Sequence, residues 1–92
     1  MSIEQNQLID AIEHDDCGRV LELIVNRVNI EEKDGNGDTP LIKAALGGKL
    51  RCLQVLIEKK AKIDFRGQLG RTALVYAAHN GHTECIEELL RH

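Results

Sequence analysis

Residues 37–48 read GDTPLIKAALGG, and residues 70–81, which lie 33 positions further on, read GRTALVYAAHNG. The two stretches align without an insertion, and the first Gly, the Thr, the Leu, the Ala pair and the final Gly recur at equivalent places. Aliphatic residues earlier in the chain follow the same spacing and form a degenerate first repeat. Self-similarity at a fixed period indicates stacked units that bury a shared core. We therefore expect a single domain, residues 1–92, with repeats at about 1–32, 33–65 and 66–92.

A 33-residue unit with a Gly-x-Thr-Pro-Leu core, an Ala pair and a following Gly resembles the ankyrin repeat. The resemblance covers essentially the whole chain, and it implies an all-α solenoid of stacked helix-turn-helix units with projecting β-hairpin loops. Ile42 and Val75 stand where the family usually has His, so the Thr-to-His hydrogen bond of the family must be absent or replaced. Lys60 stands where the family favours Gly, and a left-handed conformation there would cost roughly 1 kcal/mol.

Local signals predict where the helices begin and end. Thr39 is the expected N-cap of an inner helix whose first position is Pro40, because a missing amide donor is tolerated there. Asp15 occupies the place that Gly takes in the later repeats, so we expect a positive φ at this residue. Asn26 is the expected left-handed end of the first outer helix. The expected outer helices cover residues 18–25, 50–59 and 83–90, and the third inner helix covers residues 73–80.

Composition excludes several classes of protein. Twelve Lys and Arg residues stand against fifteen Asp and Glu residues, and the net charge of −3 gives no support to a nucleic-acid-binding surface. The chain has no apolar run near the roughly 20 residues that span a bilayer, so no membrane partner is expected. It has three Cys and no hydrophobic leader. These features predict a soluble intracellular protein, in the cytoplasm rather than the nucleus.

The oxygen-rich residues 34–38 resemble the start of a calcium loop. The loop pattern then requires Gly and, at its twelfth place, an acidic residue, but the chain has Thr39 and Ala45 there. A hairpin turn explains these residues better. The glycines also lack the following Gly-Lys-Ser/Thr of a phosphate loop. We therefore expect no cofactor and no calcium site.

Cysteine and histidine give no complete metal or catalytic site. His82 and Cys85 are three apart on a predicted helix, but a metal would need about two more ligands. Cys52 and Cys85 hold equivalent places in successive repeats, and we expect both to be buried as small apolar residues. Cys17 with His14 lacks a third orienting group and an oxyanion site. The sequence predicts no metal and no enzyme activity.

The resemblance implies that the concave face, built from hairpin tips and inner helices, binds another protein. Leu46 and Leu69 are candidate apolar anchors for a partner, because both are aliphatic residues expected to be exposed, and Tyr76 is expected near them. The alternative is that Leu69 folds over its own hairpin and Tyr76 packs between repeats. Arg66 and Arg71 would suit an acidic partner segment or would simply be solvated. The candidate partner-binding residues are Lys33, Asn36, Asp38, Leu46, Arg66, Gln68, Leu69, Arg71, Tyr76, His79 and Asn80.

A second hypothesis concerns the C-terminal end of the array. The sequence reaches His92 at an outer helix without a polar closing repeat, and Leu89 and Leu90 sit near a face that a fourth repeat would cover. Three explanations stay open: a structural piece of a longer array, a tolerated exposed end, or a self-associating unit. We expect a monomer rather than a homo-oligomer.

Overall fold

The computed structural model describes residues 3–67 and 69–92, so Gln68 lies outside the described residues. This part of the chain is all-helical and contains no strand, which confirms the expected fold class. The six helices are α1 Ile3–Glu13, α2 Cys17–Val25, α3 Pro40–Gly47, α4 Leu50–Glu58, α5 Ala73–His79 and α6 Thr83–Leu90.

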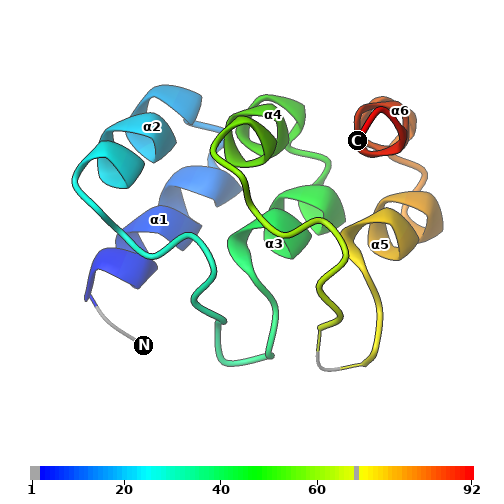
Figure 1. Ribbon diagram of the computed structural model, residues 1–92, viewed down its shortest axis with the longest axis horizontal. Coiled ribbons are helices and arrows are strands. Elements are labelled where there is room, and N and C mark those ends of the chain that lie inside the picture. The colour runs from blue at the N-terminus through cyan, green and yellow to red at the C-terminus, as the bar shows by residue number, and fades with distance from the viewer. Residues whose placement is uncertain (1–2, 68) are drawn as a thin grey trace.

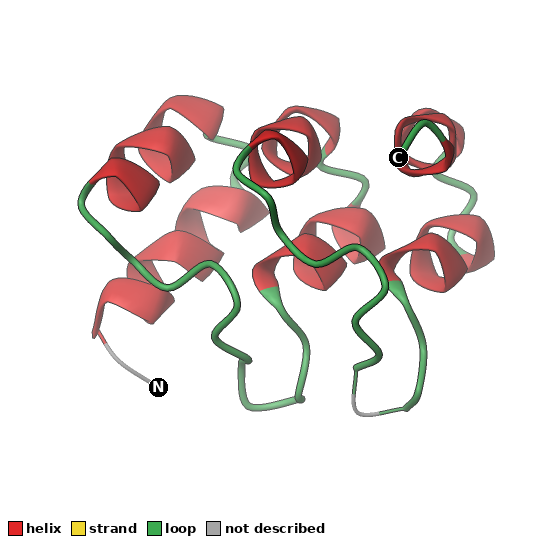
Figure 2. Ribbon diagram, viewed as in Figure 1, coloured by secondary structure: helices red, strands yellow, loops and turns green. Residues whose placement is uncertain are grey.

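The helices form two layers (Figure 1). The inner helices α1, α3 and α5 lie side by side in one layer, and α2, α4 and α6 lie above them in the other. Each inner helix also packs against the outer helix that follows it. The long loops that precede α3 and α5 project from the inner layer on the same side of the molecule (Figure 2). This order is the stacking of helix pairs that the period predicts.

The projecting loops are tight turns rather than two-stranded ribbons. In the first, the amide of Asp34 donates to the carbonyl of Asp38 (2.9 Å) and the amide of Gly37 donates to the carbonyl of Asp34 (3.0 Å). The second loop repeats this pattern between Gly67 and Arg71 (2.9 Å). The prediction of β-hairpins is therefore wrong in one respect, because a pair of backbone hydrogen bonds closes each loop without making a strand.

The helix ends largely follow the sequence signals. Thr39 caps α3 through its side chain, which accepts a hydrogen bond from the amide of Ile42 (3.4 Å). Asp15 has φ 52°, as expected from the glycines at equivalent places. The left-handed residue after α2 is Arg27 (φ 68°) rather than Asn26 (φ −81°), and α2 begins one residue earlier than expected.

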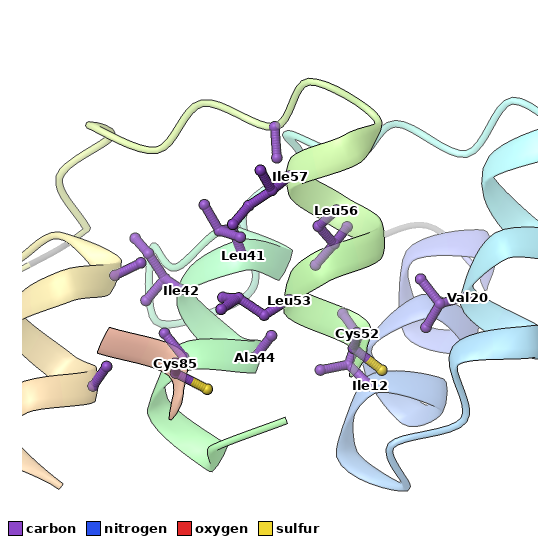
Figure 3. Packing of buried hydrophobic residues seen from close by; sticks show 14 of the residues in the cluster. Ile12, Val20, Leu41, Ile42, Ala44, Cys52, Leu53, Leu56, Ile57 and Cys85 are labelled. Atoms are coloured by element: carbon purple, nitrogen blue, oxygen red, sulfur yellow. The ribbon is translucent and has the colours of Figure 1, made fainter. Parts of the chain in front are cut away.

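The core lies between the layers and is aliphatic (Figure 3). Leu41 of α3 and Leu53 of α4 lie between these two helices, and Ile42 of α3 lies on the side that faces α5. These three side chains and Leu56 of α4 are at most 1% exposed. Small residues keep the inner helices thin: Ala44, Ala45 and Ala77 are completely buried. Cys52 and Cys85 are free and buried, as expected.

No helix in the described part of the chain is long and apolar enough to cross a membrane.

Candidate functional site

The first projecting loop is organised around the carboxylate of Asp34. Its Oδ1 accepts hydrogen bonds from the amides of Asn36 (2.8 Å) and Asp38 (3.0 Å), and its Oδ2 lies 3.3 Å from Lys43 Nζ. Burial by itself would raise the pKa of Asp34, but the two amide hydrogen bonds and Lys43 hold the pKa below its ordinary value. Asp34 therefore stays charged and fixes the shape of the loop.

Asp38 follows in the same loop and has a different environment. It is only 6% exposed, although it is one of the candidate partner-binding residues. Within the described residues, its Oδ1 is buried without a hydrogen-bond partner. Burial, reinforced by the charge of Asp34, raises the pKa of Asp38, and Lys43 offsets part of the effect.

The second projecting loop holds its arginines in intramolecular contacts. Arg66 Nη1 donates to the carbonyl of Gly70 (2.9 Å), within the same loop. The guanidinium carbon of Arg71 lies 5.8 Å from the centre of the Tyr76 ring. Between the loops, Lys33 Nζ lies 4.9 Å from the centre of the Phe65 ring. These cations are therefore held in attractive contacts within the chain, which sequence patterns do not reveal.

Four expected site residues line one hollow between the two loops. This tip hollow has a volume of about 300 Å³ and is lined by Asn36, Asp38, Leu69 and Tyr76. Leu69 is 68% exposed, so it does not fold over its own loop, whereas Tyr76 is only 8% exposed. The hollow thus combines a buried carboxylate, an aromatic ring, an exposed amide and an exposed aliphatic side chain.

The remaining inner-helix residues lie apart from the tip hollow. Leu46 is half-buried against the core rather than exposed, and it lines a second hollow of about 160 Å³ between α1 and α3. The Leu46 carbonyl accepts hydrogen bonds from Asn80 Nδ2 (3.0 Å) and His82 Nε2 (3.1 Å), so these two residues join the second repeat to the third. His79 is exposed in the last turn of α5.

Two of the three thiols, those of Cys52 and Cys85, do not form a reactive centre. Burial, with a hydrogen bond to Asp15, raises the pKa of Cys52 to about 12. Burial likewise raises the pKa of Cys85. Both thiols are therefore protonated at neutral pH and are poor nucleophiles. The described residues contain no group of three or more His, Cys, Asp or Glu placed to hold a metal ion.

Sequence reasoning missed the contact between Asp38 and Gly67. A Cβ added to Gly67 would lie 2.5 Å from Asp38 Oδ1, so this position has no room for a side chain. A signal was present in the sequence, because Gly67 falls 33 positions after Asp34 and breaks the equivalence of the two loops. The absent side chain is what allows Asp38 to be buried between them.

Comparisons with known proteins place this fold in a family. The family described as ankyrin repeats (3 copies) matches residues 8–92. The DNA replication inhibitor plutonium of Drosophila melanogaster is 38% identical over 63 residues, which cover 68% of this chain and 36% of that protein. Ankyrin repeat and SAM domain-containing protein 6 of Mus musculus is 41% identical over 66 residues, covering 71% of this chain and 7% of that protein.

A solved structure has the same arrangement of helices. It is a chain in the complex of the Bd0816 predatory endopeptidase from Bdellovibrio bacteriovorus with the immunity protein Bd3460. The TM-score is 0.84 and the identity is 34%, over 92% of this chain and 45% of that chain. This chain thus spans less than half the length of each of these three proteins. With its three stacked repeats and the match over residues 8–92, the chain belongs to the ankyrin repeat family.

Proposed function

We propose that this chain is a non-catalytic module that binds another protein through its concave face. Ankyrin repeats are protein-protein interaction modules, and the family is generally non-catalytic. The concave face is defined here as the two projecting loops and the inner helices α1, α3 and α5. Partner binding by this face follows from the family and from the way the loops leave side chains unused by the core.

The tip hollow is the observation that carries the proposal. A partner side chain that enters it would meet Leu69 and Tyr76, with polar groups from Asn36 and Asp38 at the same place. Apolar and aromatic contacts surrounded by polar groups are what a binding hot spot needs. The core does not require Leu69 at this site, because the side chain is 68% exposed. Contact with a partner protein would therefore explain why an aliphatic residue stands at position 69.

The proposal also covers the classes of partner that are excluded, the oligomeric state and the location in the cell. The raised thiol pKa values of Cys52 and Cys85 and the net charge of −3 support a binding module that takes neither a substrate nor a nucleic acid. We infer that the partner is not a membrane and that the chain is a monomer. We also infer that it works inside the cell, in the cytoplasm rather than the nucleus, where its three free cysteines stay reduced.

A matched pair of variants tests the concave face. In the first, Leu46→Gln and Leu69→Gln remove apolar contacts from the concave face without changing the charge. In the control, Leu21→Gln and Val25→Gln change two aliphatic residues of the outer helix α2, which are 40% and 70% exposed. Partners captured from an extract of the source cells are identified and purified, and their affinities for the parent and both variants are measured. We expect the first variant to lose binding and the control to keep it. Equal affinities for two folded variants contradict the proposal.

A second candidate function is stacking through the exposed face of the third repeat. Ile42 and Ile57 in the second repeat are 1% and 8% exposed, and their equivalents Val75 and Leu90 are 45% and 67% exposed. Ala78 is exposed as well, whereas its equivalent Ala45 is completely buried. The third repeat therefore carries a face of the type that the second repeat buries. Such a face supports a structural role in a longer array or in self-association.

Sedimentation velocity separates these possibilities. We compare the parent chain with a Val75→Lys, Leu90→Lys variant over an about hundredfold range of concentration. A parent that stays monomeric throughout rules out self-association, whereas dimers that the variant abolishes would establish it. Stacking onto a further repeat is measured separately, as the gain in stability when a helix pair is added after residue 92.

A further inference from the structure

We propose that the tip hollow receives a lysine or arginine side chain of the partner protein, which pairs with the carboxylate of Asp38. This inference rests on the proposed function, since it assigns a chemical class to the side chain that the concave face binds. Three features carry it: the buried carboxylate, the apolar walls beside it, and the contacts that occupy the cations nearby.

The first feature is the state of the Asp38 carboxylate. The residue is 6% exposed and its Oδ1 has no hydrogen-bond partner among the described residues. Removing a carboxylate from water is unfavourable unless a cation or hydrogen-bond donors compensate for the lost hydration. The neighbouring charge of Asp34 adds to the cost. Oδ1 itself is shielded from solvent, so a partner would contact the part of Asp38 that lines the hollow. A cation brought there would offset both effects, so the hollow favours a positively charged group over a neutral or negative one.

The second feature is the lining of the hollow. Asp38 shares it with Leu69 and Tyr76, which offer apolar surface, and with the exposed Asn36. Lysine and arginine carry a positive group on a flexible apolar stem and pack that stem along apolar surface. The volume of about 300 Å³ leaves room for one such side chain. A small inorganic cation would use the carboxylate but would leave Leu69 and the Tyr76 ring without a contact.

The third feature is that the chain's own nearby cations already have other partners. Lys43 Nζ lies 3.3 Å from Asp34 Oδ2, and Lys33 lies over the ring of Phe65. Arg71 lies over the ring of Tyr76, with its guanidinium carbon 5.8 Å from the ring centre. Lys43 offsets part of the rise in the pKa of Asp38, but no ion pair joins a described cation to Asp38, so its carboxylate is left for an external cation. Arg71 borders the site and opposes a positive ligand, so its removal is expected to strengthen binding.

Peptide probes test the inference without knowledge of the partner. Three acetylated and amidated peptides, Gly-Leu-X-Leu-Gly with X as Arg, Gln or Glu, are titrated into isotope-labelled chain and followed by NMR. We expect the Arg peptide to move the amide resonances of Asn36, Asp38 and Leu69, and the Gln and Glu peptides to leave them in place. Asp38→Asn, which keeps the shape of the side chain, should weaken binding of the Arg peptide roughly tenfold or more.

The controls distinguish the effect of the Asp38 charge in the hollow from the effect of a change in the net charge of the chain. Glu58→Gln makes the same change in net charge at an exposed residue of the outer helix α4, and it should leave the affinity unchanged. Arg71→Gln should strengthen binding of the Arg peptide. Three results overturn the inference: equal shifts with the Gln peptide, full affinity in folded Asp38→Asn, or preferential binding of the Glu peptide that Arg71→Gln abolishes. The last result would identify an acidic partner instead.

A purified partner makes the two proposals distinguishable. A partner that binds Asp38→Asn as tightly as the parent, yet fails to bind the Leu46→Gln, Leu69→Gln variant, overturns the basic-side-chain inference and leaves the concave face in place. A partner that binds the Leu46→Gln, Leu69→Gln variant normally overturns the concave-face proposal, and the inference about the partner falls with it. Asp38-dependent shifts from the Arg peptide would then show only that the hollow can bind an arginine side chain.

Discussion

The Oδ1 atom of Asp38 lies against the backbone of Gly67, so closely that a Cβ on Gly67 would stand 2.5 Å from it. The two residues belong to the projecting loops of successive repeats. Ile42 limits the space from another direction, with its Cδ1 3.4 Å from the same point. The burial of Asp38 therefore depends on the absence of a side chain in the next repeat, and this dependence can be measured.

Gly67→Ala is expected to destabilise the chain by about 1 kcal/mol, because the added methyl group must displace a buried carboxylate. Gly35→Ala is the matched control, since a Cβ there would meet nothing within 4 Å. The control should be neutral or slightly stabilising, because Ala restricts the unfolded chain more than Gly does. Urea denaturation measures both changes. In an Asp38→Ala background the cost of Gly67→Ala should disappear, and a cost that persists there would mean that the carboxylate is not its cause.

Gly48 and Gly81 occupy equivalent left-handed turns, with φ of 69° and 70°, but they have different neighbours. A Cβ on Gly48 would lie 2.6 Å from His82 Nδ1, whereas a Cβ on Gly81 would meet nothing within 4 Å. Gly81→Ala should therefore cost about 1 kcal/mol from backbone conformation alone. Gly48→Ala should cost about 2 kcal/mol more, because it also displaces His82 from the carbonyl of Leu46.

Thermal and urea unfolding of the two Ala variants check this difference. His82→Ala tests whether the His82 ring causes the difference, because it removes the ring that the methyl group of Gly48→Ala would meet. In that background Gly48→Ala and Gly81→Ala should cost nearly the same. If the costs already agree in the parent background, the contact between Gly48 and His82 has no energetic weight.

Lys60 has φ 72° at the place where ankyrin repeats favour Gly, and Arg27 has φ 68° one repeat earlier. Lys60→Gly should relieve the left-handed strain, and part of this gain is cancelled by the greater freedom of Gly in the unfolded chain. The net stabilisation should be about 0.5 kcal/mol, seen as a higher midpoint in urea. Lys59→Gly is the control, because φ there is −89° and Gly offers no relief. A loss of stability in Lys60→Gly would show that the lysine side chain contributes more than the strain costs.

The repeat period explains why much of the backbone was predictable. A shift of 33 residues transfers a helix start from Thr39 to Thr72, and both side chains accept a hydrogen bond from an amide three residues on (3.4 Å). The same shift predicted the left-handed conformation of Asp15 from the equivalent glycines. Local propensity and burial act together at these positions, so the pattern was sufficient.

The environment of the candidate site depended on contacts between repeats, which the period does not encode. Asp38 is buried because Gly67 leaves space for it, and Leu46 is half-buried where we expected it to be exposed. The contact of Lys33 with the ring of Phe65 likewise joins two loops that are far apart in the sequence. Such contacts follow from the identity of single side chains in neighbouring repeats, so a pattern shared by all repeats cannot predict them.

The pH dependence of stability should separate Asp34 from Asp38, because their pKa values move in opposite directions. The pKa of Asp34 is lowered in the folded chain, so its contribution to stability is present above the unfolded pKa of about 3.9 and is lost as the pH falls through the lower folded value. The pKa of Asp38 is raised, so its contribution is fully present below about pH 3.9 and is lost as the pH rises through the higher folded value. The two residues therefore oppose each other in the acid range.

Asp38→Asn removes the pH-dependent contribution of Asp38 to stability and keeps that of Asp34. At the lowest pH the variant and the parent should have nearly the same free energy of unfolding, because a protonated carboxyl and an amide are both neutral. As the pH rises to neutrality the variant should gain about 1 kcal/mol over the parent, since the parent must then bury a charged oxygen that lacks a hydrogen-bond partner. Urea midpoints measured from pH 3 to pH 7 give this difference directly. A variant that is less stable than the parent at neutral pH would mean that the Asp38 charge is compensated within the chain, and the reason for an external cation would be lost.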